Sequence, residues 1–126
     1  MTDSKLSDRN APDLKQRTKR FALDVIQFVE SLPSGETSRV LGRQLLRSGT
    51  SVGANYRAAK RAKSTADFIS KMGTVEAEAD ESAYWLELLM DSGKVKPVQV
   101  QPLVREANEL LAIAVASINT AKRKVR

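Results

Sequence analysis

The chain has 126 residues, of which 41% are hydrophobic and 29% are charged, and this length and composition suit one folded domain. Its net charge of +6 favours anionic partners, either nucleic acid or an acidic protein surface. The absence of histidine and cysteine excludes a Ser-His-Asp triad, a Cys-His pair, disulfides and zinc sites built from those ligands.

The first residues, MTDSKLSDRNAPDLKQ, contain no apolar segment typical of a secretion signal, and no stretch of the chain approaches a membrane-spanning length of apolar residues. We therefore expect a soluble, cytoplasmic protein without a membrane partner. Residues 1–11 are expected to form a flexible tail, and residues 12–126 are expected to form the single domain.

The first predicted helix spans about 12–32, where large apolar residues recur at helical spacing and Pro12 suits a first turn. The sequence LPSGE at 32–36 ends this helix. The second predicted helix spans about 37–63. Its inner face becomes small and polar towards the end, with Ser48, Val52, Asn55 and Ala59.

A capping pattern at Ser64 and Asp67 precedes the third predicted helix, 65–91, and Gly93 is expected to end it in a left-handed conformation. The fourth predicted helix spans about 98–124 and begins within KPVQVQP. Four amphipathic helices with short connections predict an all-α, up-down-up-down antiparallel four-helix bundle.

Opposite charges lie on the second and third predicted helices. Residues 36–63 hold seven basic residues and one acidic residue, whereas residues 65–91 hold one basic residue and seven acidic residues. Antiparallel packing across the turn places Arg47 at the level of Glu81 and Arg43 at the level of Glu87. We expect structural ion pairs here, each contributing about 0–1 kcal/mol if exposed, which fix the pairing and register of the two helices.

Two basic clusters remain once these charges cancel. One closes the second predicted helix and the other closes the fourth: Arg57, Lys60, Arg61 and Lys63, and Lys122, Arg123, Lys124 and Arg126. Both are candidate contacts for nucleic-acid phosphates, but cations at helix C-termini also complement the helix dipole. Neither cluster contains an interleaved aromatic residue, so base readout by stacking is not expected.

The segment RSGTSVGAN contains Gly49 and Gly53, four residues apart. A phosphate-binding loop would require a preceding strand and a following Lys-Ser or Lys-Thr pair, and both are missing. The spacing instead favours close packing of a neighbouring helix against small residues. If Asn55 is buried, its amide needs a partner, for which we expect a carboxylate of the third helix or a nearby hydroxyl.

The segment AYWLELLM surrounds the third predicted helix with apolar side chains, whereas a helix of a monomeric bundle buries only one stripe. This excess predicts homo-oligomerisation, with Trp85 and Leu88 as candidate interface residues.

Several stretches together resemble the 23S rRNA intervening-sequence protein family: FALDVIQFVESLP, GRQLLRSGTSVGANYRAAKRAKS, ADFISKMGTVEAEADESAYWLELLMDSG and LVREANELLAI. The resemblance covers roughly residues 15–120 and implies a ring-like homopentamer of up-down bundles. Related members include the accessory variability determinant of diversity-generating retroelements, which implies binding of nucleic acid and a reverse transcriptase through a basic surface. Gly53 stands where many members have proline, and Ala58 where others have glutamate.

The leading hypothesis is a non-enzymatic, homo-oligomeric protein, implied to be a pentamer, that binds RNA or another nucleic acid through its basic clusters. The alternative is a scaffold that docks an acidic or nucleoprotein partner such as a reverse transcriptase. An enzyme would have to use carboxylates, for which the candidates are Glu76, Glu78, Asp80 and Glu81. Di-iron bundles normally add histidine to such carboxylates, so no catalytic residue, cofactor or metal is expected.

Overall fold

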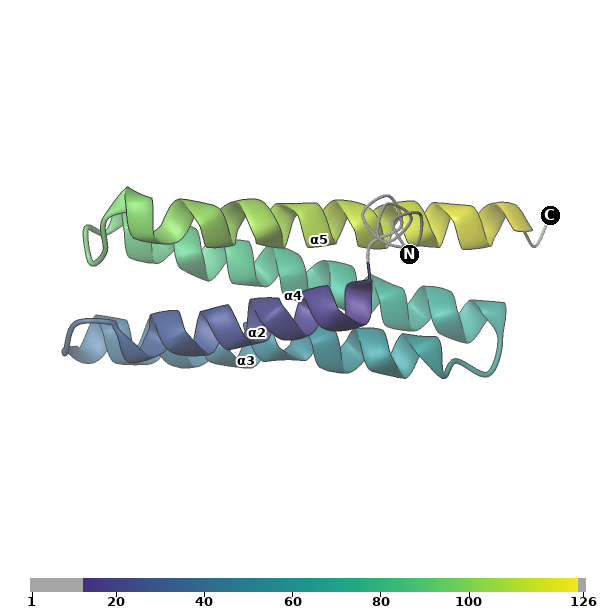
Figure 1. Ribbon diagram of the computed structural model, residues 1–126, viewed down its shortest axis with the longest axis horizontal. Coiled ribbons are helices and arrows are strands. Elements are labelled where there is room, and N and C mark those ends of the chain that lie inside the picture. The colour runs from purple at the N-terminus through teal and green to yellow at the C-terminus, as the bar shows by residue number, and fades with distance from the viewer. Residues whose placement is uncertain (1–12, 125–126) are drawn as a thin grey trace, which may run out of the picture.

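The computed structural model describes residues 13–124, so the expected tail 1–11, the helix start at Pro12 and the basic residue Arg126 lie outside the described residues. The described part is four helices without a strand, which confirms the predicted all-α fold (Figure 1). In chain order the helices are α2 (Leu14–Glu30), α3 (Glu36–Lys60), α4 (Thr65–Asp91) and α5 (Pro97–Lys124).

The helix ends follow local capping chemistry. The Ser64 hydroxyl accepts a 3.0 Å hydrogen bond from the Asp67 amide, and the Asp67 carboxylate accepts a 3.0 Å bond from the Lys63 amide. Gly93 adopts a φ of 80°, the left-handed conformation expected after the end of α4. Helix α3 ends at Lys60, three residues before the predicted boundary, and residues 61–64 form the turn into α4.

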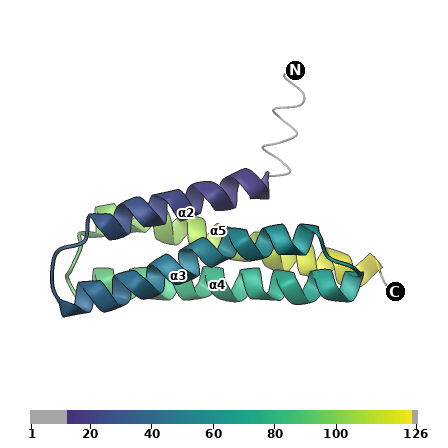
Figure 2. The ribbon, with the colours of Figure 1, turned by 90° about the horizontal axis from the view of Figure 1, so that it is seen from below.

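The helices that pack most extensively are neighbours in the chain: α2 on α3, α3 on α4, and α4 on α5, whereas α2 and α5 make few contacts. Helix α2 has only 17 residues and α3 has 25. At 1.5 Å per residue, α3 is therefore about 12 Å longer than α2, and part of this extra length continues past the start of α2. Figure 2 shows α3, α4 and α5 reaching beyond α2 at this end, which we call the three-helix end.

One continuous hydrophobic core fills the space between the helices. Phe21 and Val25 of α2, Leu45 of α3, Leu86 of α4 and Ala107 of α5 are completely buried in it. Each element contributes a stripe at three- and four-residue spacing, as expected for helices that bury one face.

The glycines of RSGTSVGAN lie inside α3 and face α2. A Cβ atom on Gly49 would lie 2.9 Å from Val25 Cγ1, and one on Gly53 would lie 3.1 Å from Thr18 Oγ1. Both distances are shorter than ordinary van der Waals contact. The small residues therefore allow close approach of α2, which is the packing that the sequence favoured over a phosphate loop.

A part-buried ion-pair cluster joins α2 to α5. Arg17 Nε donates to Glu106 Oε2 at 2.7 Å, Arg17 Nη2 donates to Glu106 Oε1 at 2.8 Å, and Nη2 also contacts Glu109. Hydrogen bonding to Glu106, with a further contribution from Glu109, raises the pKa of Arg17. Since α2 and α5 otherwise touch little, this bidentate cluster is the main polar link between the first and last helices.

Candidate nucleic-acid interface

A groove of about 790 Å³ opens at the three-helix end, where α2 does not cover its neighbours. Its walls come from the end of α3, the start of α4 and the end of α5, which lie together at the right of Figure 1. The lining residues are Ala59, Lys60, Ala62, Lys63, Ser64, Thr65, Phe68, Ile113, Ala116, Ser117, Thr120, Ala121 and Lys124. No acidic residue is among them.

The groove brings together members of both predicted basic clusters. Lys60 and Lys63 come from the first cluster and Lys124 comes from the second, more than sixty residues away in the chain. All three are exposed, and within residues 13–124 their ammonium groups form no ion pair. Three positive charges therefore converge on one groove.

The other described members of the two clusters are exposed but do not line the groove. They are Arg57, Arg61, Lys122 and Arg123. The guanidinium of Arg123 donates a 3.3 Å hydrogen bond to Thr120 Oγ1 on the same helix. These residues add positive charge to the ends of α3 and α5.

The sequence of the two clusters does not reveal one feature of this surface. Neither basic cluster contains an aromatic residue in the sequence. In the structure, however, half-buried Phe68 lines the groove together with the lysines. Phe68 belongs to the first turn of α4, and the tight turn after Lys63 returns the chain along the same groove. The aromatic neighbour comes from the next helix, α4, and is therefore not part of either basic cluster in the sequence.

Asp67 is the acidic residue nearest to this turn. Its carboxylate contacts Lys71 Nζ and accepts from the Lys63 amide, and these two hydrogen bonds, led by that of Lys71, lower the pKa of Asp67. Its negative charge is thus engaged by the start of α4. It does not pair with the side chain of a groove lysine.

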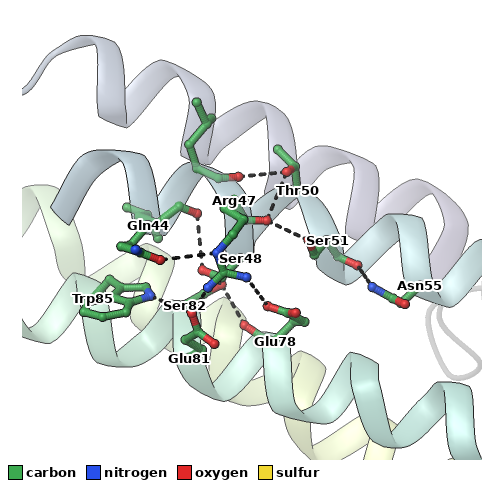
Figure 3. A network of polar contacts seen from close by, with 12 residues as sticks. Gln44, Arg47, Ser48, Thr50, Ser51, Asn55, Glu78, Glu81, Ser82 and Trp85 are labelled. Atoms are coloured by element: carbon green, nitrogen blue, oxygen red, sulfur yellow. Dashed lines mark hydrogen bonds and ion pairs between the residues drawn. The ribbon is translucent and has the colours of Figure 1, made fainter. Parts of the chain in front are cut away.

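A polar network joins α3 to α4 near the middle of the bundle (Figure 3). Arg47 contacts Glu81, which the sequence placed at its level, and its Nη1 also donates to Glu78 Oε1 at 3.3 Å. Beneath them, the hydroxyl oxygens of the fully buried Ser48 and Ser82 lie 2.9 Å apart. The opposite charges of α3 and α4 therefore hold these two helices together here.

Two sequence expectations near this network are wrong. Arg43 does not pair with Glu87, because it lines a second groove on the α2 side of α3. The position of a residue in the sequence predicts its height along the bundle. It does not predict the direction in which the side chain points around the helix. Asn55 Nδ2 donates a 2.8 Å hydrogen bond to the Ser51 carbonyl oxygen, one turn earlier, so the partner of its amide nitrogen lies within α3 itself.

A family model described as 23S rRNA-intervening sequence protein matches residues 12–116. The chain belongs to this family. A crystal structure from Bacteroides thetaiotaomicron, described as a protein of unknown function from the S23 ribosomal protein family, is similar at 34% sequence identity with a TM-score of 0.78. The match covers 83% of this chain and 97% of that chain. No curated protein matches this chain.

These matches confirm the resemblance to the 23S rRNA intervening-sequence family. The relation to the retroelement variability determinant stays a prediction. Glu78 and Glu81, two of the carboxylates considered for an enzyme, are engaged by Arg47 in this family member. In residues 13–124 no acidic side chains gather in a group that could hold a metal ion, and no helix has the length and apolarity needed to cross a membrane.

Apolar side chains remain on the outer face of α4 in this family member. Tyr84 is 53% exposed, and its ring centroid lies 5.1 Å from that of Trp85. Trp85 and Leu88, the predicted interface residues, are half-buried, and Trp85 Nε1 donates to Glu81 Oε2 at 3.1 Å. Tyr84 is therefore the most exposed aromatic residue on this face, although the apolar pattern of the sequence does not distinguish it from its neighbours.

Proposed function

We propose that this family member is a non-enzymatic, homo-oligomeric protein that binds RNA through phosphate contacts at its three-helix end. The observation that supports the proposal is the convergence of Lys60, Lys63 and Lys124 on one groove that has no acidic lining residue. Lysine ammonium groups bind phosphates as compact point charges and displace the counterions that surround a nucleic acid. The exposed arginines at the same helix ends add positive charge to this end of the bundle.

Replacing the three groove lysines by glutamine is expected to weaken RNA binding at least tenfold in low salt. Three phosphate contacts should make wild-type affinity fall about 20- to 40-fold between about 50 and 200 mM salt. The triple variant should lose most of this dependence. Fluorescence anisotropy with a labelled RNA hairpin, repeated over a salt series, measures both quantities.

The matched control replaces Lys15, Lys19 and Lys94 by glutamine. These lysines are also exposed, they lie outside the groove, and their replacement changes the net charge equally. The control should bind RNA within about threefold of wild type, because only contacts that neutralise phosphates contribute to the salt dependence. Equal losses in the two triple variants, or wild-type affinity that is independent of salt, would contradict the proposal.

We further propose that the face of α4 that carries Tyr84, Trp85 and Leu88 joins copies of the chain. Multi-angle light scattering should give a mass near five times 13.9 kDa, the pentamer implied by the family resemblance. Tyr84→Lys should reduce that mass by placing a charge on the face, whereas Val98→Lys should not, because Val98 is also exposed but lies at the start of α5 and outside this face. A wild-type monomer at micromolar concentration would refute this part.

The alternative function is a scaffold whose basic groove docks an acidic or nucleoprotein partner, such as a reverse transcriptase. The same convergence of positive charge would serve such a surface. Nuclease treatment separates the two functions, because a partner that remains bound after the RNA is digested is held by protein contacts.

A further inference from the structure

The floor of the groove at the three-helix end is apolar, although its rim is charged. Phe68 comes from α4, Ala59 from α3, and Ile113, Ala116 and Ala121 from α5, so three helices contribute to one apolar surface. Surfaces that bind only phosphates do not need such a floor. The volume of about 790 Å³ falls in the range of sites that enclose small organic groups.

A paired and an unpaired nucleotide present different chemistry to this groove. In a duplex, the base faces are stacked on one another, so the protein meets mainly phosphates and sugars. An unpaired base exposes its flat aromatic face, which can stack on a phenylalanine ring while its phosphates remain at the charged rim. An apolar floor beneath three lysines matches the second arrangement.

We propose that the groove holds an unpaired base of RNA against Phe68, with the flanking phosphates at Lys60, Lys63 and Lys124. This inference rests on the proposed RNA binding and adds a substrate class: loops, bulges and single strands in preference to duplex. Hydroxyl groups of Ser117 and Thr120 on the α5 wall are placed to hydrogen-bond polar edges of a base or a ribose 2′-hydroxyl.

The test compares an RNA hairpin that has an unpaired loop with a fully paired RNA duplex of equal phosphate number. Wild type should prefer the hairpin by about 5- to 150-fold, the range that corresponds to stacking of one base on an aromatic side chain. Phe68→Leu keeps an apolar side chain but removes the ring. It should abolish the preference, so that the variant binds the hairpin no more tightly than the duplex.

Ile69→Leu is the control, because Ile69 neighbours Phe68 and is also half-buried but does not line the groove. It should retain the hairpin preference. As a direct readout, 2-aminopurine placed in the hairpin loop should lose fluorescence on binding to wild type and to Ile69→Leu, but not on binding to Phe68→Leu.

The possible results separate the two proposals. If the protein binds the hairpin and the duplex equally and the lysine variant still loses affinity, phosphate binding stands and base insertion is wrong. If the lysine variant binds RNA as wild type does, the proposed function itself fails. A Phe68→Leu variant whose mass by light scattering falls would show that a second copy occupies the groove, which would also overturn base insertion.

Discussion

Phe21→Ala is expected to lower the free energy of unfolding by about 3–5 kcal/mol. Phe21 is completely buried in the hydrophobic core, and it is the largest side chain that α2 places there without any exposure. Removing the ring leaves a cavity between α2 and the other helices, which the neighbouring side chains can fill only in part. Urea denaturation followed by circular dichroism measures the loss.

Leu23→Ala provides the comparison on the same helix. Leu23 is 50% exposed, and leucine and alanine have similar helix propensities, so its replacement should change the unfolding free energy by less than about 1 kcal/mol. A Phe21→Ala variant that is no less stable than Leu23→Ala would show that α2 is not held by its buried face.

Gly49→Ala is expected to destabilise the bundle by about 1–2 kcal/mol, even though alanine is the better helix former. The new methyl group would lie 2.9, 3.0 and 3.2 Å from three atoms of Val25, which is completely buried. Valine is branched at Cβ and has one strongly preferred rotamer in a helix, so it cannot turn away. Helix α2 must therefore shift outward.

Gly73→Ala should have the opposite sign. A Cβ atom on Gly73 meets nothing within 4 Å, so the substitution adds helix propensity without a clash and should stabilise the protein by about 0.8–1.0 kcal/mol. The unfolding free energies of the two variants, measured side by side, test whether close approach of a neighbouring helix or helix propensity determines the effect of alanine at each position. Stabilisation by both substitutions would refute close packing at Gly49.

Helix identity could be predicted because apolar periodicity depends on local sequence. The third predicted helix, 65–91, has the observed bounds, since Ser64 and Gly93 are strong end signals. The first and second predicted helices were each extended past their observed ends. At Glu30 and Lys60 the chain leaves the helix without a residue that forces the end, and such boundaries are set by the following turn.

The three-dimensional site was less predictable than the helices. Both basic clusters could be recognised in the sequence. The groove on which their lysines converge, however, is open because α2 does not cover this end of its neighbours. The contribution of Phe68 depends on the turn that follows Lys63. Arg17 was also missed, because its partners Glu106 and Glu109 lie about ninety residues later in the chain. Such pairings follow from the packed fold.

The weak contact between α2 and α5 has a consequence for how the protein folds and opens. Because the main packing partners are consecutive helices, each can dock on the one before it without closing a long loop, and such topologies fold fast. Helix α2 packs mainly on α3 and is held to α5 chiefly through Arg17. It is therefore the helix whose backbone amides should exchange with solvent first, by local opening that leaves α3, α4 and α5 folded.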